Sequence, residues 1–257
     1  MSNLNICVAG ATGWTGAAIA EAVAAADDLT LRSAVSRSAA GSELHGAPVH
    51  AAVADALDGV DVMIDFTSHD VAKANALAAI ERGVAVVIGS SGLTAADFGE
   101  IEAAARERGV GVISAGNFSL TAAMAKAAAL LAAKHLPSWE IIDYASAGKA
   151  DAPSGTAREL AEELGAAARE RSLAETHGAV EARGADIGGT QVHSLRLPSF
   201  TVSTEIVFGL PDERLSIRHD AGSSAVPYVA GTLLAARAAP TRVGLTRGLD
   251  TLLLGDG

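Results

Sequence analysis

The segment KADAPSGTA, from Lys149 to Ala157, holds the residues whose types and spacing are best suited to chemistry. Lys149 supplies a cation, and Ser154 can cap the helix that the following residues predict. The backbone amides of Gly155 and Thr156 then lie in the first turn, where N–H groups and the helix dipole attract an anion. The segment therefore predicts a clamp that binds a carboxylate through charge-assisted hydrogen bonds. A capped helix behind a loop lysine is the alternative.

A glycine-rich turn near the N-terminus is the second candidate. The apolar run Asn5–Ala9 is followed by GATGWTG, residues 10–16, and then by a stretch with helical character. Glycines at this spacing let the backbone turn tightly and approach a pyrophosphate, whose charge lies at the helix N-terminus. The pattern predicts dinucleotide binding, and a tight strand-to-helix turn without a ligand is the alternative.

The residues that would contact the adenosine ribose follow the apolar run Leu29–Val35, where the chain reads Ser36-Arg37-Ser38. In dinucleotide-binding folds an acidic residue at this place accepts a hydrogen bond from the ribose 2′-hydroxyl of NAD. No carboxylate occurs here, and an arginine flanked by hydroxyls can neutralise a 2′-phosphate. The sequence therefore favours NADPH over NADH, although an exposed loop arginine would give the same pattern.

Two segments of small residues end later apolar runs. GSSG covers residues 89–92, and AGNF covers residues 115–118. If the strands before them are parallel, both segments lie at the carboxyl edge of the sheet, where open α/β sheets bind ligands. Their backbone amides are candidates to hold the nicotinamide, and each segment could equally be an ordinary loop.

The elements that would position these residues alternate regularly in the first half of the chain. β-branched runs, expected as strands, alternate with alanine-rich stretches, expected as helices. The runs are continuously apolar, which is typical of parallel strands covered by helices on both faces. The sequence predicts an α/β fold that begins with a Rossmann-type, doubly wound parallel sheet. Its expected strands are 5–9, 29–35, 61–67, 85–89 and 110–115, and its expected helices are 15–26, 71–82 and 95–108.

The strand-helix alternation stops near Asn117. Turn residues at Pro198-Ser199 and Pro211-Asp212 separate three later strands, which are expected to be antiparallel. This half predicts an α+β domain with a mixed, largely antiparallel sheet. Its expected strands are 139–144, 192–197, 204–208 and 215–219, and its expected helices are 121–135, 154–168 and 226–238.

Composition excludes several classes of protein. The 257 residues are 49% hydrophobic, and 19 Lys+Arg against 30 Asp+Glu give a net charge of −11. This excludes intrinsic disorder and argues against a nucleic-acid partner. With one cysteine, Cys7, and no apolar stretch typical of a signal peptide or a membrane span, we expect a cytoplasmic protein without a membrane partner. Neither CxxC nor HExxH occurs, so no metal site is expected.

Over essentially its whole length the chain resembles the dihydrodipicolinate reductase family of the diaminopimelate route to lysine. The matching segments appear in family order: GATGWTG, VMIDFT, VIGSSGLT, NFS, KADAPSGTA, VHSLRLPS, EIVFG and ERLSIRHD. KADAPSGTA is the most specific of them. The resemblance implies an NAD(P)H-dependent reductase of a cyclic imine carboxylate, closest to the reduction of 4-hydroxy-tetrahydrodipicolinate. It also implies a homotetramer assembled through the sheet of the substrate domain.

The resemblance assigns roles to individual residues. It makes Lys149 catalytic, places Gly155 and Thr156 at the substrate carboxylate, and places Arg37 near the adenosine ribose. It implies a dinucleotide-binding domain over 1–117, with 220–257 packing back on it, and a substrate-binding and oligomerisation domain over 118–219. The implied cofactor-binding residues are Gly10, Ala11, Thr12, Gly13, Trp14 and Thr15 at the pyrophosphate, and Gly89, Ser90, Ser91, Ala115, Gly116, Asn117 and Phe118 at the nicotinamide.

The chain departs from the family pattern E(L/A)HHxxK, in which a histidine pair lies four and three residues before the lysine. Ala145 and Ser146 occupy these two positions, and neither side chain can act as an imidazole acid. The family's SR pair after the last strand is also missing, because residues 221–224 read AGSS. The expected fold and cofactor do not depend on these residues. The expected substrate does depend on them.

Three functions therefore stay open: the family reaction, a paralogue that reduces another imine or acts as an amine dehydrogenase, and a cofactor-binding homologue without turnover. Retention of Lys149 and of DAPSGT favours an enzyme. The missing imidazole could be replaced by Lys149, by water or by Tyr144, while His193 and His219 are the histidines on expected strands.

Overall fold

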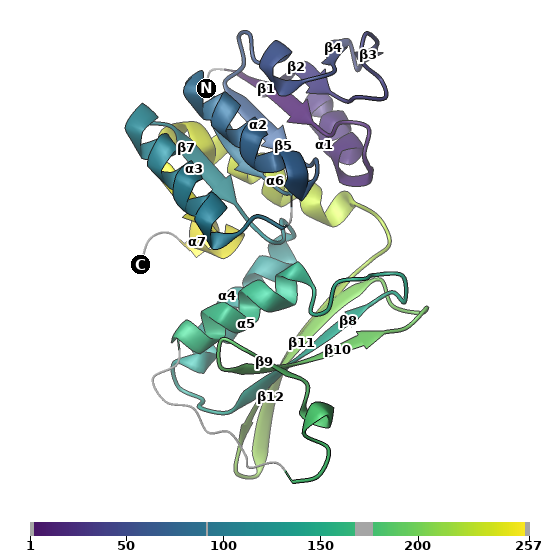
Figure 1. Ribbon diagram of the computed structural model, residues 1–257, viewed down its shortest axis with the longest axis vertical. Coiled ribbons are helices and arrows are strands. Elements are labelled where there is room, and N and C mark those ends of the chain that lie inside the picture. The colour runs from purple at the N-terminus through teal and green to yellow at the C-terminus, as the bar shows by residue number, and fades with distance from the viewer. Residues whose placement is uncertain (1–2, 91, 168–176, 255–257) are drawn as a thin grey trace. The chain divides into compact units, whose positions relative to one another are not determined.

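The computed structural model describes residues 3–90, 92–167 and 177–254. The chain forms two compact units (Figure 1). Unit 1 consists of Met1–Leu120 and Ala225–Gly257, and unit 2 consists of Thr121–Ser224.

Unit 1 contains an eight-stranded sheet with the order β13-β7-β6-β5-β1-β2-β4-β3. Every neighbouring pair is parallel except β3 and β4. The strands are β1 (Leu4–Ala9), β2 (Leu29–Val35), β3 (Glu43–Leu44), β4 (Ala47–His50), β5 (Val62–Asp65), β6 (Ala85–Ile88), β7 (Gly111–Ser114) and β13 (Gly244–Arg247).

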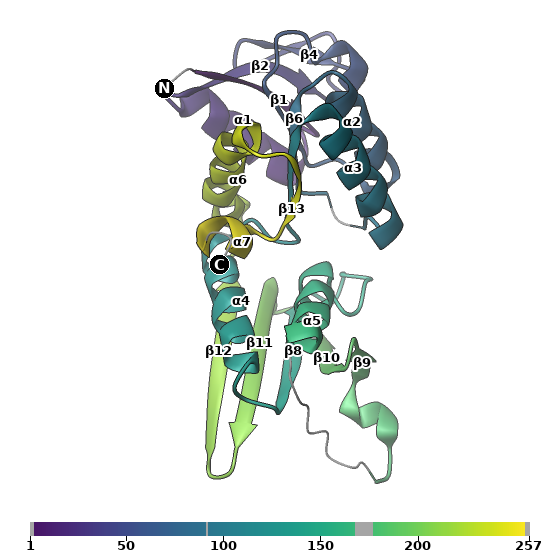
Figure 2. The same ribbon diagram turned by 90° about the vertical axis from the view of Figure 1, so that its left-hand side faces the viewer.

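Helices cover both faces of this sheet. Figure 2 shows α1 (Trp14–Ala25) and α6 (Val226–Ala238) on one face, and α2 (His69–Glu81) and α3 (Ala95–Arg108) on the other. Strands β5, β6 and β7 are buried at every residue, as expected for strands covered from both sides. The predicted Rossmann-type sheet is thus confirmed. Unit 1 also contains α7 (Leu249–Leu254) and the short 3-10 turns η1 (Val53–Asp55) and η3 (Ala239–Thr241).

Unit 2 contains a five-stranded sheet with the order β12-β11-β8-β10-β9. Helix α4 (Leu120–Ala133), whose first residue belongs to unit 1, and helix α5 (Gly155–Ala167) pack on one face of it, where Trp139, Ile141, Leu164 and Phe208 form the centre of the core. The strands are β8 (Trp139–Ala145), β9 (Ala185–Ile187), β10 (Thr190–Arg196), β11 (Val202–Leu210) and β12 (Glu213–Ala221), and η2 (Val180–Arg183) is a 3-10 turn.

The mixed sheet predicted for this half is confirmed, but one strand direction was wrong. We expected all three late strands to be antiparallel, and β11 and β12 are antiparallel to their neighbours. Strand β10, however, pairs with β8 in parallel and is antiparallel only to the short strand β9. The reason is the connection: α5 lies between β8 and β10 in the chain and carries it back across the sheet, so that β10 starts at the same end as β8.

The burial of β8 alternates strictly, which defines two faces of the second sheet. Trp139, Ile141, Asp143 and Ala145 point to the inner face, the side of α4 and α5. Tyr144 and its alternating neighbours point to the outer face. This alternation decides which polar side chains of β8 can act together.

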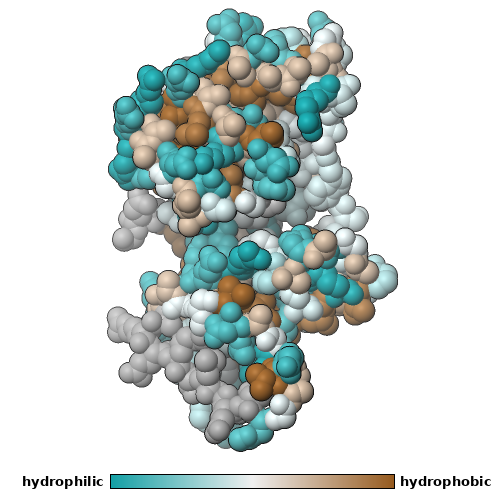
Figure 3. Space-filling model, in the orientation of Figure 1, coloured by the Kyte–Doolittle hydropathy of each residue, from teal (hydrophilic) through white to brown (hydrophobic). Residues whose placement is uncertain are grey.

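The face of the molecule shown in Figure 3 mixes hydrophilic residues with smaller hydrophobic patches over α2 and α3. Within the described residues, no helix combines the length and apolar character that crossing a bilayer requires. Cys7 is fully buried in β1, and burial raises the pKa of its thiol to about 11. Since the thiolate is the reactive form, Cys7 is a core residue and not a nucleophile.

Candidate active site

The glycine-rich turn lies where the strand order of the first sheet reverses. From β1 the chain moves outward to β2 and β4, and it then returns to β5 on the other side of β1. Loops at the carboxyl ends of the two strands flanking this reversal form the usual ligand crevice of an open α/β sheet. Gly10 and Phe66 begin these two loops.

Two glycines of this turn have no room for a side chain. Gly10 has a φ of +81°, and a Cβ there would lie 2.4 Å from the carbonyl oxygen of Phe66. A Cβ on Gly16 would lie 2.0 Å from the carbonyl oxygen of Gly10, so Gly16 lets α1 pack closely on β1. Gly13 caps α1 without a side-chain hydrogen bond, and the first turn contains no acidic residue. The helix N-terminus is therefore suited to an anion.

The expected ribose loop adjoins this turn through hydroxyl groups. Thr12 Oγ1 and Ser36 Oγ are 2.7 Å apart, and Ser36 Oγ and Ser38 Oγ are 3.2 Å apart. Arg37 is exposed beside them. Within the described residues its guanidinium forms no ion pair with a carboxylate, which suits it to an external anion. Trp14 is 60% exposed and contacts Tyr228 of α6 edge-on, with ring centroids 6.0 Å apart.

A buried carboxylate that our sequence interpretation missed organises the next two loops. Asp65, at the end of β5, accepts hydrogen bonds from the backbone N–H and hydroxyl of Thr67, from the amide of Asn75 and from the hydroxyl of Ser90 at 2.6 Å. Its side chain thereby ties the loop after β5 to the loop after β6. The signal was present in VMIDFT, where an acidic residue closes an apolar run.

The expected nicotinamide-side residues differ in their exposure. Gly89 is needed under the Phe66 ring, because a Cβ there would lie 2.2 Å from a ring carbon. Asn117 Oδ1 accepts a hydrogen bond from the N–H of Ser119. The Phe118 ring is buried and packs against Phe66, so only its backbone can face a ligand. Gly89, Ser90, Ala115 and Gly116 follow β6 and β7 at the same edge, whereas Ser91 lies outside the described residues.

The expected carboxylate clamp lies in unit 2, between β8 and α5. Ser154 Oγ accepts a hydrogen bond from the N–H of Ala157, which confirms that Ser154 caps α5. Gly155 is exposed at the start of the helix. Lys149 Nζ pairs with Asp151 Oδ1 at 2.8 Å, so the cation already has a carboxylate partner on its own loop. Burial raises the pKa of Asp151, but the hydrogen bond and charge of Lys149 outweigh this and hold the pKa below its usual value.

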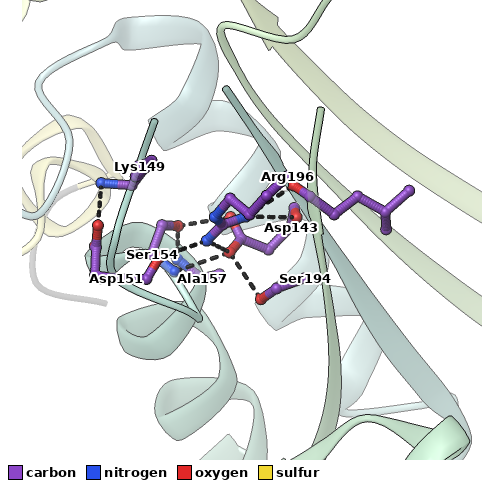
Figure 4. A network of polar contacts seen from close by, with 8 residues as sticks. Asp143, Lys149, Asp151, Ser154, Ala157, Ser194 and Arg196 are labelled. Carbon is purple, nitrogen blue, oxygen red and sulfur yellow. Dashed lines mark hydrogen bonds and ion pairs between the residues drawn. The ribbon is translucent and has the colours of Figure 1, made fainter. Parts of the chain in front are cut away.

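An ion pair beneath this loop was also missed by our sequence interpretation (Figure 4). Asp143 of β8 is fully buried and pairs with Arg196 of β10, Oδ2 to Nη2, at 2.8 Å. Burial raises the pKa of Asp143, but the bonds from Arg196 and Ser154 outweigh it and leave the pKa lowered. The nearest sequence signal was Asp143 itself, which stands at the acidic position of the family pattern.

The candidates for a replacement proton donor are divided between the two faces of the second sheet. Tyr144 points to the outer face, where its hydroxyl donates to Glu205 at 3.0 Å, and burial raises its pKa. His193 lies on the same face and pairs with Glu140 at 2.7 Å. His219 shares the inner face with Asp143, because both pair with Thr204 in register. Burial lowers the pKa of His219.

The positions of the missing histidine pair differ in the space around them. Ala145 is fully buried at the end of β8, and the next residue, Ser146, is only partly buried. No group of three His, Cys, Asp or Glu side chains within the described ranges is arranged to hold a metal ion.

Comparison with known proteins matches both halves of the chain to one family. The family model described as "Dihydrodipicolinate reductase, N-terminus" matches residues 4–118, and the one described as "Dihydrodipicolinate reductase, C-terminus" matches residues 116–253. A 4-hydroxy-tetrahydrodipicolinate reductase of Streptococcus thermophilus is 34% identical over 255 residues, covering 98% of this chain and 100% of the relative. One of Nocardia farcinica is 35% identical over 261 residues, covering 97% and 98%.

Solved structures show the same fold. A dipicolinate-bound dihydrodipicolinate reductase from Paenisporosarcina sp. TG-14 superposes with a TM-score of 0.83 at 24% identity, covering 97% of this chain and 99% of that one. An amine dehydrogenase from Mycobacterium smegmatis superposes with a TM-score of 0.65 at 12% identity, covering 97% and 96%. The family resemblance seen in the motifs is thus confirmed over the full length. With both halves matched in order and full-length relatives above 30% identity, this chain belongs to the dihydrodipicolinate reductase family.

Proposed function

We propose that this protein is an NADPH-dependent reductase that reduces the C=N bond of a cyclic imine carboxylate of the 4-hydroxy-tetrahydrodipicolinate class. The observation that carries the proposal is the capped α5 N-terminus, preceded by the loop on which Lys149 pairs with Asp151, in a chain whose relatives are reductases of this class. Unit 1 is the dinucleotide-binding domain, and unit 2 is the substrate-binding and oligomerisation domain. The protein works in the cytoplasm, without nucleic-acid or membrane partners.

The residues of unit 1 fit a dinucleotide. The turn at Gly10 and Gly13 and the N-terminus of α1, which has no side-chain cap, hold the pyrophosphate, and Arg37 holds the 2′-phosphate. The loops tied together by Asp65 border the nicotinamide end. When bound, the reduced nicotinamide supplies the hydride that reduces the substrate.

Arg37→Ala tests the cofactor preference. We expect the wild type to bind NADPH more tightly than NADH, because no carboxylate follows β2 and Arg37 can pair with the 2′-phosphate. Losing a charge-assisted bond worth about 1.5–3 kcal/mol should weaken NADPH binding roughly ten- to a hundredfold and NADH binding much less. Calorimetric titration of both cofactors measures this. Equal losses for the two cofactors would remove Arg37 from the 2′-phosphate role.

The residues of unit 2 fit a carboxylate. Lys149 supplies charge, and the N–H groups of Gly155 and Thr156 supply directed hydrogen bonds. When a substrate binds, its carboxylate takes the place of the Asp151 carboxylate beside Lys149, so that the ammonium group stays paired. Lys149 can also orient the substrate or deliver its proton.

A specific observation favours a second candidate function. Ala145 and Ser146 replace the family's histidine pair, and this departure favours a paralogue whose substrate is another cyclic imine, or a keto acid together with ammonia. NADPH oxidation should be measured with 4-hydroxy-tetrahydrodipicolinate, with other cyclic imine carboxylates, and with keto acids plus ammonia. Turnover with the cyclic imines alone supports the proposed reaction class, and turnover only with keto acids plus ammonia would favour an amine dehydrogenase. Cofactor binding without any turnover would indicate a non-catalytic homologue.

The proposal includes a homotetramer formed through the outer face of the second sheet. This face carries Ile142, Val207 and the Tyr144 ring, and α4 and α5 pack on the opposite side. Burying such a face between copies is the usual way to cover a one-sided sheet. Analytical ultracentrifugation should show a tetramer that Val207→Glu disrupts, whereas Val243→Glu, at an exposed site in unit 1, should not. A monomeric wild type would refute this part of the proposal.

A further inference from the structure

The proposed function gives no role to the buried ion pair between Asp143 and Arg196, which lies next to the loop of the carboxylate clamp (Figure 4). The Asp143 side chain is fully buried and the Arg196 side chain is 16% exposed. Burying two charges costs desolvation energy, and such pairs are often no better for stability than apolar residues of similar volume. The pair therefore calls for an explanation in terms of what it holds in place.

The carboxylate of Asp143 holds the N-terminal end of α5. One oxygen accepts a hydrogen bond from the backbone N–H of Ser154 at 2.8 Å, and the other accepts from its hydroxyl at 2.7 Å. Because that hydroxyl donates to Asp143, its lone pairs are turned toward the N–H of Ala157, which it caps at 3.2 Å. Asp143 thus sets the orientation of the cap as well as the position of the helix end.

The guanidinium of Arg196 holds the middle of the same loop. Its Nη2 donates to Asp143 Oδ2 at 2.8 Å and to the carbonyl oxygen of Asp151 at 2.7 Å. Its Nη1 donates to the carbonyl oxygens of Asp143 and Leu195. The backbone of Asp151 is thereby fixed to β8 and β10, while its carboxylate pairs with Lys149. A chain of contacts leads from Arg196 to the ammonium group.

We propose that Asp143 and Arg196 are positioning residues of the carboxylate clamp. They hold loop 149–156 in its binding geometry before a substrate arrives, Asp143 through the Ser154 cap and Arg196 through Asp151 and Lys149. This inference rests on the proposed function, because it assumes that the loop binds a carboxylate. Preorganisation of this kind raises affinity by removing the entropy cost of ordering the loop on binding.

The geometry requires an arginine at position 196. A planar guanidinium presents several N–H donors in fixed directions and can bond a carboxylate and two or more carbonyl oxygens together. A lysine carries one ammonium group and cannot reach the same set of acceptors in one plane. Arg196→Lys therefore keeps a positive charge opposite Asp143, and we expect the variant to fold. It loosens the contact with the carbonyl oxygen of Asp151.

The test compares Arg196→Lys with a matched control, Arg183→Lys. Arg183 also pairs with a carboxylate on β8, Glu140, but on the outer face of the sheet. Two measurements are made on each full-length protein. Hydrogen exchange without ligand reports how firmly residues 150–157 are held, and calorimetry reports the affinity for pyridine-2,6-dicarboxylate and for NADPH.

For Arg196→Lys we expect exchange across residues 150–157 to be about tenfold faster and dicarboxylate binding roughly tenfold weaker, with NADPH binding unchanged. Arg183→Lys should change none of the three. Asp143→Asn, which keeps an acceptor oxygen for Ser154 but removes the charge, should resemble Arg196→Lys.

Unchanged exchange in Arg196→Lys would overturn the proposal. Faster exchange with unchanged dicarboxylate affinity would overturn it as well, because the pair would then support the loop without affecting binding. A wild type that binds NADPH but not the dicarboxylate would contradict the proposed function instead, and the exchange measurement would still decide whether Arg196 holds the loop.

Discussion

Ser146→His should raise turnover with 4-hydroxy-tetrahydrodipicolinate by about 10²–10⁴-fold, the usual contribution of a positioned general acid. The wild type should turn over this substrate slowly, because Ala145 and Ser146 stand where the family has its histidine pair. Two of the other candidate donors are not placed to replace it. Tyr144 and His193 point to the outer face of the second sheet, away from the face that carries Asp143.

The structure separates the two histidine positions. Ala145 is fully buried, so Ala145→His must insert a ring into packed space, which typically costs about 1–3 kcal/mol. Ser146 is only partly buried and can accept a larger side chain more easily. We therefore expect Ser146→His to fold normally, and the double variant with Ala145→His to be less stable even if it is more active.

Ser146→Gln is the matched control, because its side chain is similar in length and polarity but does not titrate near neutral pH. Initial rates of NADPH oxidation should rise for Ser146→His and stay at the wild-type level for Ser146→Gln. A wild-type kcat near the typical enzyme value of about 10 s⁻¹ on this substrate would contradict the prediction and show that the histidines are dispensable.

Lys149→Met should weaken substrate binding roughly ten- to a hundredfold, because it removes a charge-assisted contact worth about 1.5–3 kcal/mol. Turnover should fall as well if the ammonium also orients or protonates the substrate. Methionine keeps much of the length of the side chain and deletes the charge. The variant also leaves Asp151 without its cation, so the remaining carboxylate repels the substrate and adds to the loss.

NADPH affinity is the internal control, since the cofactor-binding residues belong to unit 1. Lys134→Met provides a second control, because Lys134 is an exposed lysine of unit 2 that follows α4. Asp151→Asn separates the two contributions by removing the repelling carboxylate, and it should restore part of the affinity lost in Lys149→Met. If Lys149→Met changed neither substrate affinity nor turnover, the substrate site would have to lie elsewhere.

Local patterns in the sequence were sufficient to predict most of the longer elements. The continuous apolar runs predicted β1, β2, β5, β6 and β7, because strands buried on both faces can contain few polar residues. The Ser154 cap was likewise predictable, because its hydroxyl accepts from the N–H of Ala157, three residues further along the chain, and so the cap is a local pattern.

The short elements were not predictable in this way. Strands β3, β4, β9 and β13 are short and include charged residues, proline or glycine, so they lack the continuous apolar run that predicted β5, β6 and β7. Each pairs with a neighbouring strand of its sheet. Strand β13 pairs with β7 across more than a hundred residues of sequence. The parallel direction of β10 was similarly decided by how α5 carries the chain across the sheet.

The sequence by itself thus determined the family and the Rossmann-type sheet, and it pointed to the loop that we propose as the carboxylate clamp. Only the tertiary structure decided what holds that loop, because Asp143 and Arg196 are 53 residues apart and meet through the register of β8 with β10. It likewise decided that Asp65 ties two cofactor-side loops together and that Tyr144 faces away from Asp143. Each of these depends on strand pairing and side-chain direction, which nonlocal packing fixes and no local pattern encodes.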